Sequence, residues 1–241
     1  MNIHVFEEQS QIDRVGALLV AAQVLRKPDS VLGFATGSTP LGIYRQMVEM
    51  YRGGLVDFSQ CYTFNLDEYY GLAPDHEQSY AYYMWKNLFA DLELDPEQVN
   101  LPDGLAENPE EECWEYEEKI ADLDGIDFQI LGIGRNGHIG FNEPGSVFEA
   151  HTHLVDLTAD TRDANARFFD NPEEVPSQAL SMGTGSIMRA REIVLIATGS
   201  EKADAVAAMV NGPVDPACQA SILQCHPVVT ILLDQAAAAK L

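Results

Sequence analysis

The sequence predicts an α/β fold with an open, doubly wound, mostly parallel sheet and helices on both faces (Rossmann-like). Short apolar runs of strand length alternate along the chain with longer segments of helical periodicity, which is typical of a parallel sheet covered on both sides. No linker, low-complexity tract or long repeat separates them, and 46% of the 241 residues are hydrophobic. We therefore expect one domain over residues 1–241.

The amino-terminal elements follow the βα order. Residues 2–6 alternate as a strand, and Ser10 with Asp13 resembles a capping box at the start of a helix. Apolar residues then recur at helical spacing until just before Pro28. The sequence therefore opens with a strand followed by a long helix.

The later elements continue this alternation. Strands are predicted at 31–35, 61–65, 127–133, 193–197 and 228–233, and helices from about 41 to 50 and at 78–91, 109–122 and 201–210. Residues 153–182 contain Arg167 but show little core-like periodicity. From this we expect a lid that closes over a bound ligand.

Composition excludes several classes of function. The 38 acidic residues against 14 basic ones give a formal net charge of −24, which repels nucleic acids and anionic membranes. No apolar run is long enough for a membrane helix, and the amino terminus does not resemble a secretory signal. The four cysteines are scattered and match no standard ligand spacing. We expect a cytoplasmic protein with reduced thiols and no metal.

Two glycine loops, each following an apolar run, are candidate phosphate sites. In Thr36-Gly37-Ser38-Thr39-Pro40 the glycine permits close approach, the hydroxyls can cap a helix and the proline suits a first helical position. Amides at a helix start carry partial positive charge that favours phosphate, although an ordinary capped turn is the alternative. The related Ala197-Thr-Gly-Ser200 is followed by Lys202, a cation at a helix start, which favours a bound anion.

The segment Gly132-Ile-Gly134-Arg-Asn136-Gly137 matches a dinucleotide-binding pattern. That pattern requires a crossover helix, and Asn142-Glu-Pro-Gly145 interrupts the space for one. We reject the nucleotide interpretation. The segment instead fits a catalytic turn in which Glu143 orients His138 as a proton carrier and Asn136 assists, while a purely structural histidine remains the alternative.

Two acids and two arginines complete the candidate residues. Asp67 and Glu68 follow a strand in apolar surroundings, where a buried acid of raised pKa could act as a general base, although vicinal acids commonly lie on the surface. The pattern does not identify which of the two would act. Arg162 and Arg167 could grip a phosphate or form salt bridges with the many acids.

Together these segments resemble the glucosamine-6-phosphate deaminase family over nearly the whole chain, from about residue 30 to 233. The resemblance rests on Thr36-Gly-Ser-Thr-Pro40, Asn65-Leu-Asp-Glu-Tyr69, Gly137-His-Ile-Gly-Phe-Asn-Glu-Pro144, Asp160-Thr-Arg-Asp-Ala-Asn-Ala-Arg-Phe-Phe169 and Gly199-Ser-Glu-Lys202. The glycine loop alone is not specific, whereas the acidic motif combined with the histidine motif is.

The resemblance implies a cofactor-independent conversion of glucosamine 6-phosphate and water to fructose 6-phosphate and ammonia, in amino-sugar catabolism. It implies that His138, held by Glu143, opens the pyranose ring and that Asp67 moves a proton from C2 to C1. Lys202, Arg167 and the amides of residues 37–39 would hold the phosphate, with Thr36 and Gly132 among the residues that line the site.

Two departures qualify this resemblance. Some family members have aspartate where this chain has Asn136, which can orient His138 but supplies no charge. The larger, allosteric members have basic residues where this chain reads His153-Leu-Val155, and they extend further at the carboxyl end. The chain therefore resembles the short, unregulated type, a monomer or a small homo-oligomer.

Two other functions are alternatives to this one. The 6-phosphogluconolactonases share the expected fold and the glycine loop but lack the Phe141-Asn-Glu-Pro144 run. A sugar-phosphate-sensing module of a transcription regulator would need a DNA-binding segment and a basic face, and neither is visible in the sequence.

Overall fold

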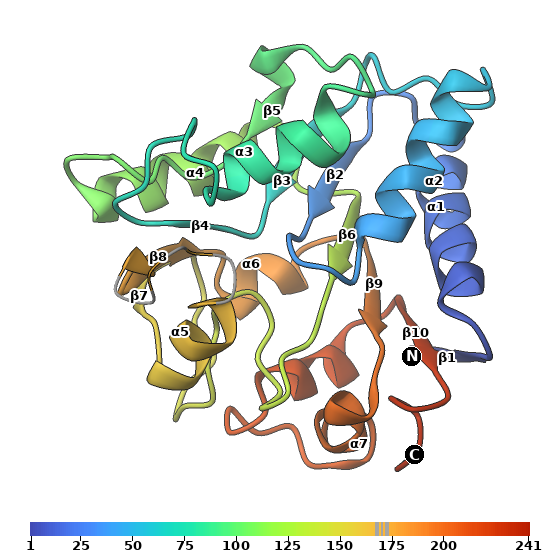
Figure 1. Ribbon diagram of the computed structural model, residues 1–241, viewed down its shortest axis with the longest axis vertical. Coiled ribbons are helices and arrows are strands. Elements are labelled where there is room, and N and C mark those ends of the chain that lie inside the picture. The colour runs from blue at the N-terminus through green and yellow to red at the C-terminus, as the bar shows by residue number, and fades with distance from the viewer. Residues whose placement is uncertain (167–168, 170, 172–173) are drawn as a thin grey trace.

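The computed structural model describes residues 1–166, 169, 171 and 174–241. Its central sheet has seven strands in the order β1-β10-β9-β6-β2-β3-β5 (Figure 1). The strands of this sheet are β1 (Asn2–Phe6), β2 (Val31–Phe34), β3 (Tyr62–Asn65), β5 (Val99–Asn100), β6 (Phe128–Leu131), β9 (Glu192–Ala197) and β10 (Val229–Asp234). All neighbouring pairs are parallel, which confirms the predicted fold class.

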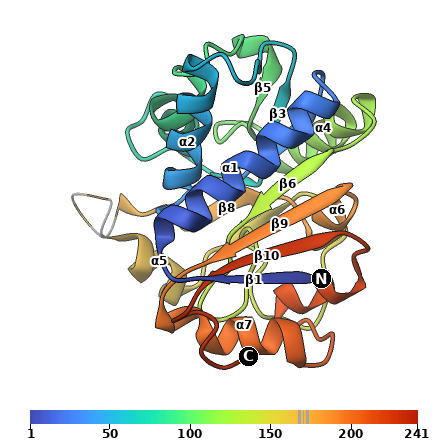
Figure 2. The ribbon, with the colours of Figure 1, turned by 90° about the vertical axis from the view of Figure 1, so that its right-hand side faces the viewer.

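Helices cover both faces of this sheet, as Figure 2 shows for α1 and α7. The helices are α1 (Gln9–Arg26), α2 (Leu41–Arg52), α3 (Tyr80–Met84), α4 (Pro109–Asp122), α5 (Ala159–Asn165), α6 (Thr184–Met188) and α7 (Ala203–Asn211). One apolar core joins the sheet to α1, α2 and the π-helical turn Trp85–Phe89 that continues α3. A second core joins it to α4, α6 and α7. Strands buried on both faces explain why their sequences read as continuous apolar runs.

A second, three-stranded sheet was not predicted. It consists of β4 (Asp67–Tyr69), β8 (Gln178–Ser181) and β7 (His153–Asp156), and its strands pair antiparallel. The expectation that Asp67 and Glu68 lie beyond a strand end is therefore incomplete, because after one intervening residue the chain forms β4 itself. Three residues are too few to show strand periodicity, and the pairing partner β8 lies more than a hundred residues later.

Two further details differ from expectation. The capping box of helix α1 pairs Glu8 with Gln11, whose side chain accepts the backbone amide of Glu8, so the predicted box of Ser10 and Asp13 is wrong by two residues. The segment 153–182 is less loop-like than its sequence indicates, because Leu180 in β8 is fully buried. That residues 153–182 form a lid stays a prediction, but the two strands at the ends of this segment, β7 and β8, belong to the second sheet. Within the described parts of the chain, no helix is long and apolar enough to cross a membrane.

Candidate active site

The candidate site is a pocket of about 480 Å³ at the carboxyl ends of β2, β6 and β9. These strands are neighbours in the sheet, and the chain order reverses between β2 and β6. In open α/β sheets the crevice at such a reversal is the usual ligand site. The lining residues come mainly from the loops after these three strands: residues 35–40, residues 132–136 with His138, Gly140 and Phe141, and Glu201 with Lys202.

Two of these loops turn through glycines of positive φ. Gly37 has φ +101° and Gly199 has φ +92°, a backbone region that favours glycine, and this accounts for the repeated Ala-Thr-Gly-Ser sequence. Helix α2 begins after Pro40 without a side-chain cap and without an acidic residue in its first turn. Its amino-terminal dipole is therefore not offset locally, which suits an anion in the pocket.

Lys202 brings a positive charge to the same pocket. It closes a 3-10 turn, Ser200–Lys202, directly before α7, and it lines the pocket together with Glu201. Asp234 at the end of β10 accepts the amide of Gly199 (2.9 Å) and so holds this turn against the sheet. A cation and an uncapped helix start thus face one cavity in a protein of net charge −24.

The loop after β6 carries a histidine–carboxylate pair. His138 Nδ1 lies 3.5 Å from Glu143 Oε1, at the outer limit of a hydrogen bond. Asn136 links the two residues, because its Nδ2 donates to Glu143 Oε2 (2.6 Å) and its Oδ1 accepts the backbone amide of His138 (3.1 Å). Thr161 also donates to Glu143. Asn136 and Glu143 are therefore held in place around His138.

This environment keeps Glu143 ionised. Burial by itself would raise the pKa of Glu143, but the nearby His138, with hydrogen bonds donated by Thr161 and Asn136, outweighs burial and lowers the pKa to about 2. An ionised carboxylate thus lies beside the imidazole of His138, which lines the pocket.

Two glycines allow close packing at this turn, Gly134 against His138 and Gly137 against Cys218. A methyl group at Gly134 would lie 2.4–2.5 Å from three atoms of the imidazole ring, and one at Gly137 would lie 2.7 Å from Cys218 Sγ. Gly137 also has φ +89°. These glycines of the rejected dinucleotide pattern thus serve the packing of the turn around His138. No helix follows them before β7, as the rejection of that pattern requires.

The structure places the two vicinal acids, Asp67 and Glu68, in different environments. Glu68 is 2% exposed and accepts three backbone amides at 2.8 Å, those of Tyr69, Tyr80 and Ala81. It thereby ties β4 to the start of α3. Asp67 instead lines the pocket and is 6% exposed. Burial, and then the charge of Glu68, raises the pKa of Asp67 to about 8.

The structure brings most of the sequence-predicted site residues to one pocket. Lining it are Thr36, Gly37, Ser38, Thr39, Asp67, Gly132, Asn136, His138 and Lys202, and Glu143 contacts His138 from behind. Arg167 lies outside the described residues. Arg162 donates to the carbonyl of Val175 and is not among the lining residues.

Other lining residues were missed from the sequence. Arg135 adds a second cation, and Tyr80 and Phe141 form an aromatic wall with ring centroids 6.1 Å apart. Arg135 lies within the sequence 132–137, three residues before His138, so its position in the sequence could have identified it as a candidate site residue. The aromatic wall joins residues 61 positions apart and had no local signal. Among the described residues, no three His, Cys, Asp or Glu side chains are arranged to hold a metal ion.

Comparison with known proteins gives consistent matches. The family model for glucosamine-6-phosphate isomerases and 6-phosphogluconolactonase matches residues 10–232. A glucosamine-6-phosphate deaminase of Halothermothrix orenii is 52% identical over the full length of both chains. The solved structure of a monomeric glucosamine-6-phosphate deaminase is 40% identical, with a TM-score of 0.97 over all of both chains. The 6-phosphogluconolactonase of Leishmania guyanensis, 23% identical with a TM-score of 0.75 over 98% of this chain and 97% of its own, shares the fold.

Proposed function

The chain belongs to the family of glucosamine-6-phosphate isomerases and 6-phosphogluconolactonases, and we propose that it converts glucosamine 6-phosphate and water to fructose 6-phosphate and ammonia. The observation that carries this proposal is one pocket that joins a buried acid of raised pKa, a histidine–carboxylate pair and a phosphate-compatible helix start. Deamination with isomerisation needs all three: a base for carbon, a proton carrier for ring oxygen, and an anchor for the phosphate.

The phosphate binds at the positive side of the pocket. The amides of residues 37–39 and the Lys202 ammonium are its partners, and Arg135 adds positive charge from the neighbouring loop. Thr36 and Gly132 complete the lining, and Arg167 remains a predicted phosphate ligand. Anchoring the far end of the sugar fixes C1 and C2 relative to the proton-transfer groups.

Ring opening is assigned to His138. It accepts the proton of the C1 hydroxyl and returns a proton to the ring oxygen, which breaks the C1–O5 bond and leaves the open-chain aldehyde. Glu143 stabilises the imidazolium between these two transfers. Asn136, hydrogen-bonded to both residues, holds Glu143 in position relative to His138. Asn136 contributes geometry rather than charge, so the ionised carboxylate comes from Glu143.

Proton transfer on carbon is assigned to Asp67. Its carboxylate takes the proton from C2 while the substrate's ammonium group gives a proton to O1, which leaves an enolamine; return of the C2 proton to C1 then gives a protonated imine at C2. Water adds to that imine and ammonia leaves, so fructose 6-phosphate forms with atoms and charge balanced. A buried base of raised pKa is strong enough to accept a proton from carbon when it is ionised.

Several wider features belong to the same proposal. The enzyme works in amino-sugar catabolism in the cytoplasm, as a single domain over residues 1–241, and residues 153–182 cover the bound sugar. We expect a monomer, because the structural neighbour at TM-score 0.97 is described as monomeric. Light scattering of the purified chain checks the mass, and protection of the lid from protease by fructose 6-phosphate checks closure.

The direct test measures ammonia and fructose 6-phosphate released from glucosamine 6-phosphate, in chelator and without added cofactor. Equal molar amounts of the two products support the proposal. Hydrolysis of 6-phosphogluconolactone in the same preparation, without ammonia release from the amino sugar, would overturn it. Binding of the sugar phosphate without any turnover would leave a sensor as the better interpretation.

A further inference from the structure

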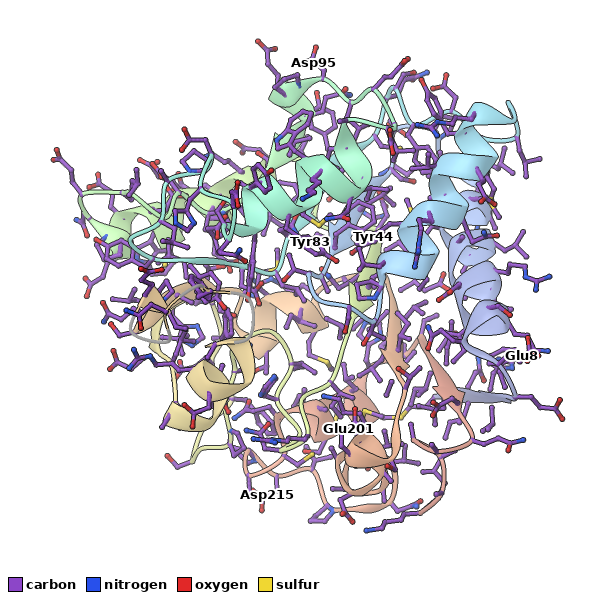
Figure 3. The ribbon with its side chains drawn as sticks, in the orientation of Figure 1. Glu8, Tyr44, Tyr83, Asp95, Glu201 and Asp215 are labelled. Atoms are coloured by element: carbon purple, nitrogen blue, oxygen red, sulfur yellow. The ribbon has the colours of Figure 1, made fainter. Side chains whose placement is uncertain are left out.

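Two tyrosine hydroxyls donate hydrogen bonds to backbone carbonyls of the loop after β2. Tyr44 in α2 donates to the carbonyl oxygen of Ala35 (2.5 Å), and Tyr83 in α3 donates to the carbonyl oxygen of Gly37 (2.5 Å). Figure 3 shows the two side chains next to each other beside the loop after β2. Neither is among the described residues that line the pocket. They are therefore placed to act on the loop and not on a ligand.

We propose that Tyr83 and Tyr44 are positioning residues for phosphate binding, which hold the peptide planes of the loop so that its amides point into the pocket. The peptide group is planar, and in its trans form the carbonyl and the following amide point in opposite directions. The carbonyls of Ala35 and Gly37 point to the tyrosines. The amide of Ser38, one of those assigned to the phosphate, consequently points away from Tyr83, and the amide of Thr36, where the loop begins, points away from Tyr44; both residues line the pocket.

Gly37 makes this support necessary. Its φ of +101° is accessible to glycine at little cost, and a methyl group built on it would meet no atom within 4 Å. Because glycine also restricts ψ little, Gly37 by itself does not fix the plane between Gly37 and Ser38. A turned plane would direct a carbonyl oxygen at the phosphate and withdraw an amide. The Tyr83 hydroxyl opposes that rotation by hydrogen bonding to the carbonyl.

The two tyrosines differ in how firmly they are held. Tyr44 is fully buried, and its ring packs edge-on against Phe34, with centroids 5.6 Å apart. Tyr83 is partly exposed and comes from α3, whose start is held by Glu68. The proposal thus links the helix that carries Tyr83 to the phosphate loop on the neighbouring β2–α2 connection. Burial raises the pKa of both phenols, so both remain hydrogen-bond donors at neutral pH.

This inference rests on the proposed function for its kinetic readout but can be tested without turnover. We expect Tyr83→Phe to weaken fructose 6-phosphate binding, measured by calorimetry, by about three- to tenfold, the effect of losing one hydrogen bond. The KM for glucosamine 6-phosphate should rise by the same factor while kcat stays within about twofold, because Asp67 and His138 are untouched. Tyr44→Phe should act in the same direction.

The matched control is Tyr51→Phe, which removes a hydroxyl bonded to Glu93 on the surface and should leave both constants unchanged. Melting temperatures identify any loss of folding in Tyr44→Phe, and Tyr83→Phe then carries the test alone. Wild-type affinity and KM in Tyr83→Phe would overturn the proposal. So would a three- to tenfold loss of kcat in this variant without any loss of affinity. Wild-type protein that binds fructose 6-phosphate but releases no ammonia would refute the proposed function and leave the tyrosine test intact.

Discussion

Replacing Gly134 with alanine tests whether the position of His138 matters for catalysis. The backbone of residue 134 does not need positive φ, and the hydrogen bond that its amide donates to the carbonyl of His138 (2.9 Å) can remain. The added methyl carbon, however, would lie 2.4 Å from Cε1 and 2.5 Å from both ring nitrogens of His138. The fold should therefore persist while the imidazole is forced to move.

The size of the effect follows from these distances. Carbon atoms in contact prefer separations of about 3.5–4.0 Å, so the ring has to withdraw by roughly 1 Å. Its Nδ1 is already 3.5 Å from Glu143 Oε1, and a shift of this size breaks the pair. Displacements of about 1 Å from a productive geometry cost about a hundredfold in rate. We expect kcat to fall by about that factor, with little change in fructose 6-phosphate affinity because residues 36–39 and Lys202 are untouched.

The assay is steady-state ammonia release, with calorimetry for fructose 6-phosphate. Gly145→Ala is the matched control, since a methyl group there meets only the carbonyl of Glu143 at an ordinary 3.6 Å and the residue does not line the pocket. A Gly134→Ala enzyme with a kcat within twofold of wild type would refute the reasoning. So would an equal loss in Gly145→Ala, because the effect would then belong to the loop as a whole.

Three further substitutions test the other groups. Asp67→Asn should abolish turnover, and wild-type kcat should rise with pH up to about 8, since burial and the charge of Glu68 raise the pKa of Asp67 to about 8 and only the ionised form accepts a proton. Because the pKa of Asp67 is raised on folding, the stability that protonated Asp67 contributes is fully present below about pH 4 and is lost as pH rises through 8. Asp67→Asn should therefore have a higher melting temperature than wild type at pH 9. A lower melting temperature would contradict this. Glu143→Gln should lower kcat by about a hundredfold, because a neutral amide cannot stabilise the imidazolium; unchanged kcat would remove Glu143 from the mechanism. Lys202→Met should raise KM by about tenfold or more at low salt, with a smaller difference at high salt, and a KM insensitive to both the substitution and salt argues against phosphate contact.

Prediction from sequence succeeded where the signal is local. Inner strands of the large sheet are buried on both faces, so apolar runs such as 193–197 were readable. Helix 109–122 was predicted with its observed bounds. The second sheet was missed because β4 is short and pairs with a distant strand. Likewise, the carbonyl contacts of Tyr44 and Tyr83 depend on how α2 and α3 meet the loop after β2. Such roles arise from tertiary contacts and leave no pattern in the neighbouring residues.

The vicinal acids show why tertiary contacts decide chemistry. Side chains alternate across a strand, so neighbours on β4 point to opposite sides and their environments differ. Glu68 receives three amides, and although burial raises its pKa to about 7, those hydrogen bonds favour its ionised form. Asp67, facing the pocket, has burial and that neighbouring charge acting in the same direction. The structural acid therefore makes its neighbour a stronger base, and Glu68→Gln should shift the rising limb of the kcat profile to lower pH; a profile that keeps its midpoint would show that the two carboxylates are not coupled.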